Sequence, residues 1–434
     1  MTTAAGRPAL RRHLSLVDGF VLYTSAVLGQ SLIVLPSIAA RRAGPWSILV
    51  WAALAAISYP LARIMAELGV RYPSAGGVMT FIGHGLGRYV GWLTGTLYLA
   101  AIVVGGPATA LVFAEYAGTL VPLSREGHYL VAGLVMAVLI LGNCFPVDQI
   151  MRLQRVGFFI CLGAITAALL LALPHVDPVR ITDTTGYSLT GVASSGLIAF
   201  FAFVGWENAA FSGEEFADPR TLIKSLGMAV AAVGLLFVLL GVAVVGGLSR
   251  TVISGSDASL ADLTRLSLGS QAAGAASTVA LLLLLLFMFT WTRSGTRLVY
   301  ALAREGVVLP PVLAKVSARS GSPVRAALAL GGAWALAFAV QIFLGVSLET
   351  YIELASGNFL LTYVLIVLAA WRLLFGRRFL PALVISTVAI LLLVAAGFQS
   401  LWYALATALL FAFIGAARRA ATGRRRGPAI PVSA

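Results

Sequence analysis

Charged residues are scarce in this chain of 434 residues. Asp, Glu, Lys and Arg together make up 11%, hydrophobic residues make up 60%, and the mean hydropathy is +0.96. So little polar sequence cannot coat a soluble globule of this length, and the composition therefore excludes a soluble domain. It favours an all-helical protein that crosses a membrane several times.

Residues that carry catalytic or metal chemistry are also few. The two cysteines, Cys144 and Cys161, fall in or near predicted membrane spans, which suits free thiols better than a disulfide framework. The sequence contains no phosphate-binding P-loop, and no Ser/His/Asp set follows from residue order. We therefore expect no enzyme, no cofactor and no ATP-driven pump. Metal-ligand spacing is also absent from the scattered histidines, which are His13, His84, His128 and His175.

Apolar runs long enough to cross the hydrocarbon core, roughly 20 residues each, occur twelve times. The first run is too long, with no small-residue cleavage site after it, for a removable signal peptide. Asp18 is its expected N-cap. We expect spans at 18–40, 45–68, 91–121, 128–146, 153–174, 191–213, 222–248, 272–300, 324–345, 350–371, 380–397 and 399–417.

The basic residues are distributed unevenly between the loops. With the N-terminus in the cytoplasm, 24 Lys and Arg residues fall at inner loops or helix ends and 6 at outer ones. By the positive-inside rule, this distribution places both termini in the cytoplasm. The net charge of +14 therefore does not indicate nucleic acid, and the run Arg424 to Arg426 is most simply a tail beside anionic lipid. We divide the chain into a cytoplasmic tail (1–17), ten core spans (18–371), two added spans (380–417) and a basic cytoplasmic tail (418–434).

The sixth predicted span is interrupted by residues that do not suit a lipid-facing helix. Gly205 and Glu207 stand in the middle of an apolar run, where a charge costs roughly 2.5 kcal/mol or more. The first span is interrupted at 28–31, and the two spans enter the membrane from opposite sides. Corresponding broken helices in two inverted halves are typical of a transporter with a binding site at the midplane.

Four motifs stand out along the chain: FFAFVGWE (200–207), EEFADPR (214–220), RLVYALAREG (297–306) and GSPVR (321–325). Together they resemble the amino acid-polyamine-organocation (APC) superfamily over nearly the whole chain. RYPSAGGV (71–78), GGPA (105–108) and GFQSL (397–401) are most similar to a bacterial subgroup that exports methionine and branched-chain amino acids. The resemblance implies twelve helices in a bacterial cell membrane. Ten would form a five-plus-five inverted repeat with helices 1 and 6 broken.

Breaks of this kind expose backbone groups that could hold a zwitterion. Amides that open the second half of span one carry positive partial charge and could receive a carboxylate, while carbonyls freed in span six could accept from an ammonium. Simple helix packing is the alternative for the two glycines. The expected donors are Leu28, Gly29, Gln30 and Ser31, and the expected acceptors are Phe203, Val204 and Gly205.

The resemblance also implies the walls of the pocket. Aromatic and Met side chains suit an apolar substrate, although lipid-facing or core positions are the usual ones for such residues. Gln30 and Ser31 depart from the superfamily's small residues, which leaves a different small amino compound open as substrate. The implied wall residues are Ser25, Phe201, Phe287, Met288, Phe289 and Trp291.

Glu207 and Arg293 are the candidates for proton coupling or gating. Glu207 either exchanges a proton as the site opens to each side or accepts hydrogen bonds that hold the unwound helix. Arg293, in the inner half of span eight, needs a carboxylate that Glu207 or Glu67 could supply, or it extends to the interface. The inner-loop charges are expected to form a solvated network of Glu214, Glu215, Asp218, Arg220 and Lys224.

We expect a secondary active transporter that exports neutral, mostly apolar L-amino acids of the methionine, leucine, isoleucine and valine type. Alternating access and proton antiport are the expected mechanism, so amino acid, protons and the lipid bilayer are the partners. A proton-coupled importer and an exporter of another small amino compound are the alternatives. A sensor without transport would bind an amino acid and show no flux. Sodium coupling and the oligomeric state stay open at this point.

Overall fold

The computed structural model describes residues 14–118, 120–145, 147–203, 205–255, 259–269, 272–306, 308–396 and 400–421. The described residues form helices joined by loops, with one isolated parallel β-bridge between Leu14 and Phe216. This agrees with the all-helical class that the composition predicts.

Each of the twelve predicted segments falls on one helix or, for the sixth, on a series of helical pieces. Within the described ranges, eight helices are long and apolar enough to cross a membrane, and the first half of the first helix and the last two helices are shorter apolar segments. The helices are α1 (Leu16–Ala43), α2 (Trp46–Arg71), α4 (Arg88–Gly118), α5 (Arg125–Gly142), α6 (Val147–Ala172), α8 (Leu189–Phe200) with η2 (Phe201–Phe203) and α9 (Asn208–Phe211), α10 (Pro219–Gly247), α13 (Ala273–Glu305), α14 (Val324–Phe343), α15 (Leu348–Leu373), α16 (Leu380–Ala396) and α17 (Leu401–Ala421).

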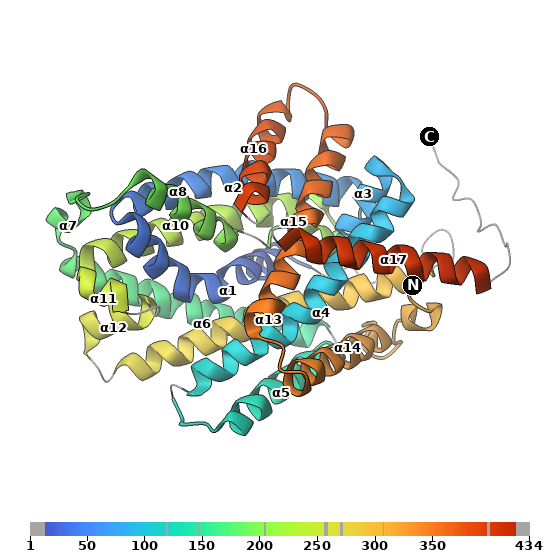
Figure 1. Ribbon diagram of the computed structural model, residues 1–434, viewed down its shortest axis with the longest axis horizontal. Coiled ribbons are helices and arrows are strands. Elements are labelled where there is room, and N and C mark those ends of the chain that lie inside the picture. Colours follow the sequence, from blue (N-terminus) through green and yellow to red (C-terminus); the bar gives the residue numbers. More distant parts are fainter. Residues whose placement is uncertain are drawn as a thin grey trace.

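Short helices gather at the two ends of the molecule. Most long helices run along its longest axis, with α7, α11 and α12 at one end and α3 at the other (Figure 1). We call these ends the α7 end and the α3 end. The short elements are α3 (Val78–Leu86), η1 (Leu173–His175), α7 (Pro178–Thr182), η3 (Gly213–Glu215), α11 (Arg250–Gly255), α12 (Ser259–Leu268) and η5 (Pro311–Ala314).

Some helix contacts recur in matched pairs when the helices of the first five predicted spans are compared with those of the next five. The contact of α1 with α10 has its counterpart in α8 with α2, and that of α4 with α15 in α6 with α13. The contact of α4 with α5 likewise corresponds to that of α13 with α14. Two halves built on one plan would produce this pattern.

The start of α1 differs in detail from the sequence prediction. Ser15 and not Asp18 is the N-cap, because the Ser15 hydroxyl accepts from the Asp18 amide at 3.2 Å. Asp18 completes a capping box by accepting from the Ser15 amide at 3.0 Å. Its carboxylate also lies 3.4 Å from Arg155 of α6. The acid therefore ties the beginning of α1 to a neighbouring helix.

Candidate functional site

The break in the sixth span lies directly against α1. Gly205 has φ +133°, a backbone conformation that side chains rarely permit. A Cβ at this position would lie 2.7 Å from the Ala26 carbonyl oxygen and 3.1 Å from Val27. Both the dihedral and the close approach therefore require glycine here.

The break in α1 occurs at Gly29, whose φ of −32° and ψ of −120° are not helical. The Phe287 ring of α13 packs against this glycine where a Cβ would stand. Ser31 donates its hydroxyl hydrogen to the Val27 carbonyl at 2.7 Å. Ser31 thus satisfies a carbonyl beside the break, which was not anticipated from the sequence.

Aromatic side chains from three helices form a cluster beside the first half of α1, close to the break. Trp291 of α13 donates its indole hydrogen to the Ala26 carbonyl at 3.1 Å. Its ring lies 5.8 Å from that of Phe287, 6.1 Å from Tyr98 of α4 and 5.3 Å from Phe359 of α15, measured between centroids. Two of the predicted wall residues, Phe287 and Trp291, are therefore at the break.

Glu207 is fully buried and accepts hydrogen bonds on both carboxylate oxygens. Tyr98 donates to Oε1 at 3.2 Å, the Gly205 amide donates to Oε2 at 3.1 Å, and Tyr363 of α15 also donates to Oε2. These bonds join the unwound part of span six to α4 and α15. A carboxylate that accepts such bonds can hold the break, and its role in proton exchange stays a prediction.

The carbonyl of Gly205 is already occupied. It accepts from the Asn208 side-chain amide at 2.8 Å and from the Asn208 backbone amide at 3.1 Å. A carbonyl oxygen has two lone pairs, so little capacity is left there for a substrate ammonium. Phe203 is another predicted acceptor, through its backbone carbonyl. Its side-chain ring packs against Trp51 and Phe237, at centroid distances of 6.3 and 5.4 Å.

The other predicted site residues lie in different settings. Ser25 is 2% exposed, and its hydroxyl has no hydrogen-bond partner among the described residues. Phe289 packs against α5, where a Cβ on Gly142 would meet its ring at 3.1 Å. Val204 and the side chains of Gln30 and Phe201 lie outside the described residues.

Arg293 pairs with Glu215, so the predicted pairing with Glu207 or Glu67 is wrong. The Arg293 Nη2 lies 2.6 Å from Glu215 Oε2, and Arg297 one turn later lies 3.0 Å from Oε1. The arginine is 5% exposed and so does not reach the interface, as snorkelling would require. The loop after the break brings Glu215 into contact with α13. Glu67 instead pairs with arginines of its own helix.

Glu215 is 1% exposed, so the expectation of a solvated loop network is wrong for this residue. Glu214 is partly buried, pairs with Arg304 at 3.4 Å and accepts from the Ala75 amide beside α3 at 2.8 Å. The carbonyl of Glu215 accepts from the Leu14 amide at 3.2 Å. The start of α1, the loop after span six and α13 are thereby fastened together at the α3 end.

Sequence reasoning missed Arg297, Tyr98 and Tyr363 as partners of the two buried acids. Arg293 and Arg297 are four residues apart and so share one helix face, which could have indicated a common buried carboxylate. The tyrosines offered no such signal, because their contacts with Glu207 join positions 109 and 156 residues apart.

The sequence model of the amino acid permease family matches residues 14–424 of this chain. The chain belongs to this family. Amino acid permeases are multi-pass membrane transporters and not enzymes, and membership of the APC superfamily implies the inverted-repeat fold. An amino acid is thus the implied substrate of this permease.

Individual relatives extend over most of the permease. It is 29% identical over 375 residues to the uncharacterized amino acid permease YecA of Bacillus subtilis (strain 168), covering 86% of this chain and 87% of the relative. It is 28% identical over 400 residues to the L-methionine/branched-chain amino acid exporter YjeH of Escherichia coli (strain K12), covering 91% and 94%. Cationic amino acid transporter 4 of Homo sapiens is 27% identical over 412 residues, covering 86% and 61%.

Proposed function

We propose that this permease exports neutral, mostly apolar L-amino acids of the methionine, leucine, isoleucine and valine type by proton antiport. It would act as a twelve-span protein of a bacterial cell membrane with both termini and the α3 end in the cytoplasm. The observation that carries the proposal is the close approach of the span-six break at Gly205 to Ala26 and Val27, which directly precede the α1 break at Gly29. The similarity to an exporter of methionine and branched-chain amino acids over 91% of the chain supports the substrate class.

The substrate carboxylate would bind the amides that follow the α1 break, at Gly29, Gln30 and Ser31. These amides begin a helical segment, and their partial positive charge favours an anion. The ammonium would donate to the Phe203 carbonyl at the end of η2 and to the carbonyl of Val204, the next residue in the sequence. The Ser25 hydroxyl, buried without a partner in the described part of the chain, is available to the ligand as well.

The apolar substrate side chain would displace Phe287 and pack against the remaining aromatic rings. Phe287 fills the space over Gly29 in the present structure. Because rings packed in a protein interior shift between discrete rotamers, its movement would open the site. Trp291 holds the Ala26 carbonyl and so keeps the first half of α1 in place while Phe287 moves.

Access from the α3 end would be controlled by Glu215. The paired Arg293 and Arg297 bind this acid to α13, and the Leu14 amide binds its carbonyl to the start of α1. Opening towards the cytoplasm requires these elements to separate. The ion pairs of Glu215 with Arg293 and Arg297, together with its bond to Leu14, would therefore all form only in the conformation closed at this end.

Glu207 would couple proton movement to this cycle. Its Oε2 accepts from two donors, and protonating that oxygen would turn an acceptor into a donor and displace one of them. Replacing Glu207 with Gln is expected to leave amino acid flux that no longer responds to pH. The measurement is efflux from proteoliposomes at equal pH and with the outside acidified.

Tyr98→Phe is the matched control for Glu207→Gln, because it removes one hydrogen bond to the same carboxylate and keeps the acid. It should retain the response to pH. If folded Glu207→Gln protein keeps the pH response of the wild type, Glu207 serves only to hold the break.

Flux from proteoliposomes loaded with mixed amino acids tests the proposed function. We expect loss of methionine, leucine, isoleucine and valine, faster when the outside is acidified, because protons then enter in exchange. Retention of these amino acids by folded protein, with or without the gradient, would contradict the proposal.

A proton-coupled importer is the second candidate, since the same geometry serves both directions. It would show amino acid and protons moving the same way in that experiment. Loss of a different small amino compound alone would identify an exporter with another substrate. Saturable amino acid binding with no flux under any gradient would identify a sensor.

A further inference from the structure

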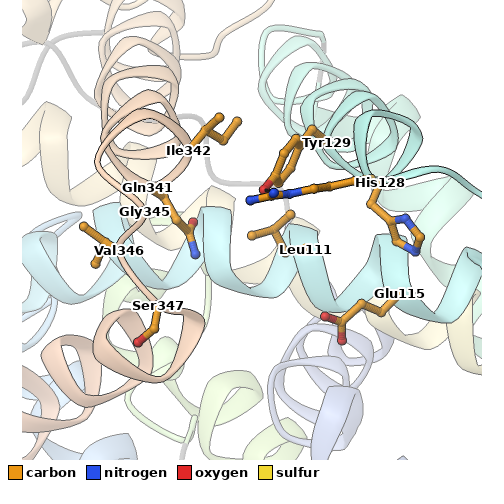
Figure 2. Close-up of a pocket in the computed structure, with 10 residues that line it drawn as sticks. Leu111, Glu115, His128, Tyr129, Gln341, Ile342, Gly345, Val346 and Ser347 are labelled. Atoms are coloured by element: carbon orange, nitrogen blue, oxygen red, sulfur yellow. Dashed lines mark hydrogen bonds between the residues drawn. The ribbon is translucent and has the colours of Figure 1, made fainter.

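A cavity of about 630 Å³ lies apart from the helix breaks, between the end of α4, the start of α5 and the end of α14. It belongs to the α7 end, because α4 begins beside α3 and rises roughly 35 Å from Arg88 to Leu111, its first residue at the cavity. Figure 2 shows Leu111 and Glu115 of α4, Tyr129 and His128 of α5 and Gln341 of α14 around it.

The lining carries opposite charges that do not neutralise each other. Arg125 donates from Nε to the Tyr129 hydroxyl at 3.1 Å, which fixes the guanidinium, while its terminal nitrogens bond to no described residue. Glu115 on α4 has neither a hydrogen bond nor an ion pair within the described part of the chain. An exposed cation and an exposed anion, each without an ion-pair partner among the described residues, thus line the same cavity.

Gln341 adds a buried acceptor. It is 6% exposed, and its Oε1 has no hydrogen-bond partner among the residues described. A buried amide oxygen left without a donor destabilises the protein, so the cavity favours an occupant that donates hydrogen bonds. His128 is oriented by its own bond, from Nδ1 to the Ser124 carbonyl at 2.8 Å.

The rim of the cavity is apolar and exposed. Phe343 and Leu344, which follow the lining residues of α14, are 85% and 73% exposed, and Leu130 beside Tyr129 is 64% exposed. In a membrane protein, such residues at the end of a spanning helix meet lipid. Because the cavity lies where α4 and α14 end and α5 begins, next to these lipid-facing residues, we infer that it lies at the level of the lipid headgroups.

We propose that this cavity binds a zwitterion that carries a primary ammonium and a phosphate, as in the headgroup of an ethanolamine phospholipid. The phosphate accepts from the terminal nitrogens of Arg125, for which a planar guanidinium is well suited. The ammonium donates to Glu115 and to Gln341 Oε1. A choline headgroup has the same charges but no N–H, so it leaves both acceptors unsatisfied. The site is separate from the proposed transport path and does not depend on its substrate.

Lipid retention by the purified full-length permease tests the proposal. The protein is incubated with equal amounts of phosphatidylethanolamine and phosphatidylcholine that have identical acyl chains, and bound lipid is measured by native mass spectrometry. We expect at least a tenfold preference for the ethanolamine lipid. Arg125→Gln and Glu115→Gln should each bring the ratio close to one.

Glu126→Gln is the matched control, because Glu126 is an exposed acid next to Arg125 that does not line the cavity. It should keep the wild-type ratio, and size-exclusion profiles should show that all variants fold. Equal retention of both lipids by the wild type, or a preference that survives in Arg125→Gln and Glu115→Gln, would overturn the proposal.

A second arm distinguishes a lipid from a soluble ligand. O-phosphoethanolamine is titrated into delipidated protein and into protein that holds the ethanolamine lipid. Displacement of the lipid by O-phosphoethanolamine, or binding of that probe without lipid retention, supports the site, and the latter assigns it to a free ligand. Binding of neither molecule rules it out.

Discussion

Replacing Gly205 with Ala is expected to reduce amino acid efflux from proteoliposomes at least tenfold. The alanine backbone would have to adopt φ +133°, and its Cβ would lie 2.7 Å from the Ala26 carbonyl oxygen. Backbone strain of this kind costs about 1–3 kcal/mol, and overpacking adds about 1–3 kcal/mol. Span six would withdraw from α1, which separates the two halves of the proposed binding site. A lower melting temperature of the purified variant should accompany the loss of flux.

Gly196→Ala provides the control in the same span. A Cβ at Gly196 would meet only Val50, at 3.9 Å, and alanine is the better helix former. Its flux and melting temperature should equal or exceed those of the wild type. Wild-type flux in Gly205→Ala would mean that the close approach of span six to α1 is not needed for transport.

Replacing Glu215 with Ala is expected to destabilise the permease by about 3–5 kcal/mol, because Arg293 and Arg297 would remain buried without a countercharge. The loss should appear as a large fall in melting temperature and in the yield of folded protein. Adding Arg293→Met to Glu215→Ala should recover part of the stability, since one of the two unpaired charges is removed.

Glu67→Gln is the comparison for this prediction. Glu67 is also an acid at the α3 end, but its arginine partners lie on its own helix and are 28% and 41% exposed. Partly exposed pairs contribute about 0–1 kcal/mol, so this variant should fold normally. Equal stability of Glu215→Ala and Glu67→Gln would show that the buried network does not support the fold.

The sequence was informative about helices and about where they break. Long apolar runs gave the positions of the spans, since hydrophobic length is a local property of the chain. Gly29 and Gly205 indicated the interruptions because glycine permits non-helical backbone. Such backbone has unpaired polar groups, which are tolerated within a membrane only where they are buried in protein or line a cavity. The breaks occur at those two glycines.

Pairing between distant side chains was not predictable to the same degree. Arg293 needed an acid, but the choice of Glu215 depends on how the loop after α9 folds beneath α13, which is a tertiary feature. The same holds for the tyrosines that donate to Glu207. Phe289 shows a further limit, because successive residues of α13 face different neighbours, and it packs on α5 while Phe287 packs on α1. Helical spacing alone does not say which face meets the break.

Competition for the binding of radiolabelled L-leucine tests most directly whether the two breaks hold the two ends of a zwitterion. The competitors are 4-methylpentanoate, which lacks the ammonium, and L-leucinol, which lacks the carboxylate, each measured on the purified permease. Sites built to form such hydrogen bonds discriminate strongly against analogues that lack them, and we expect both competitors to be weaker than leucine by roughly 100-fold or more. Competition by either analogue as effective as that of leucine would contradict binding through both breaks.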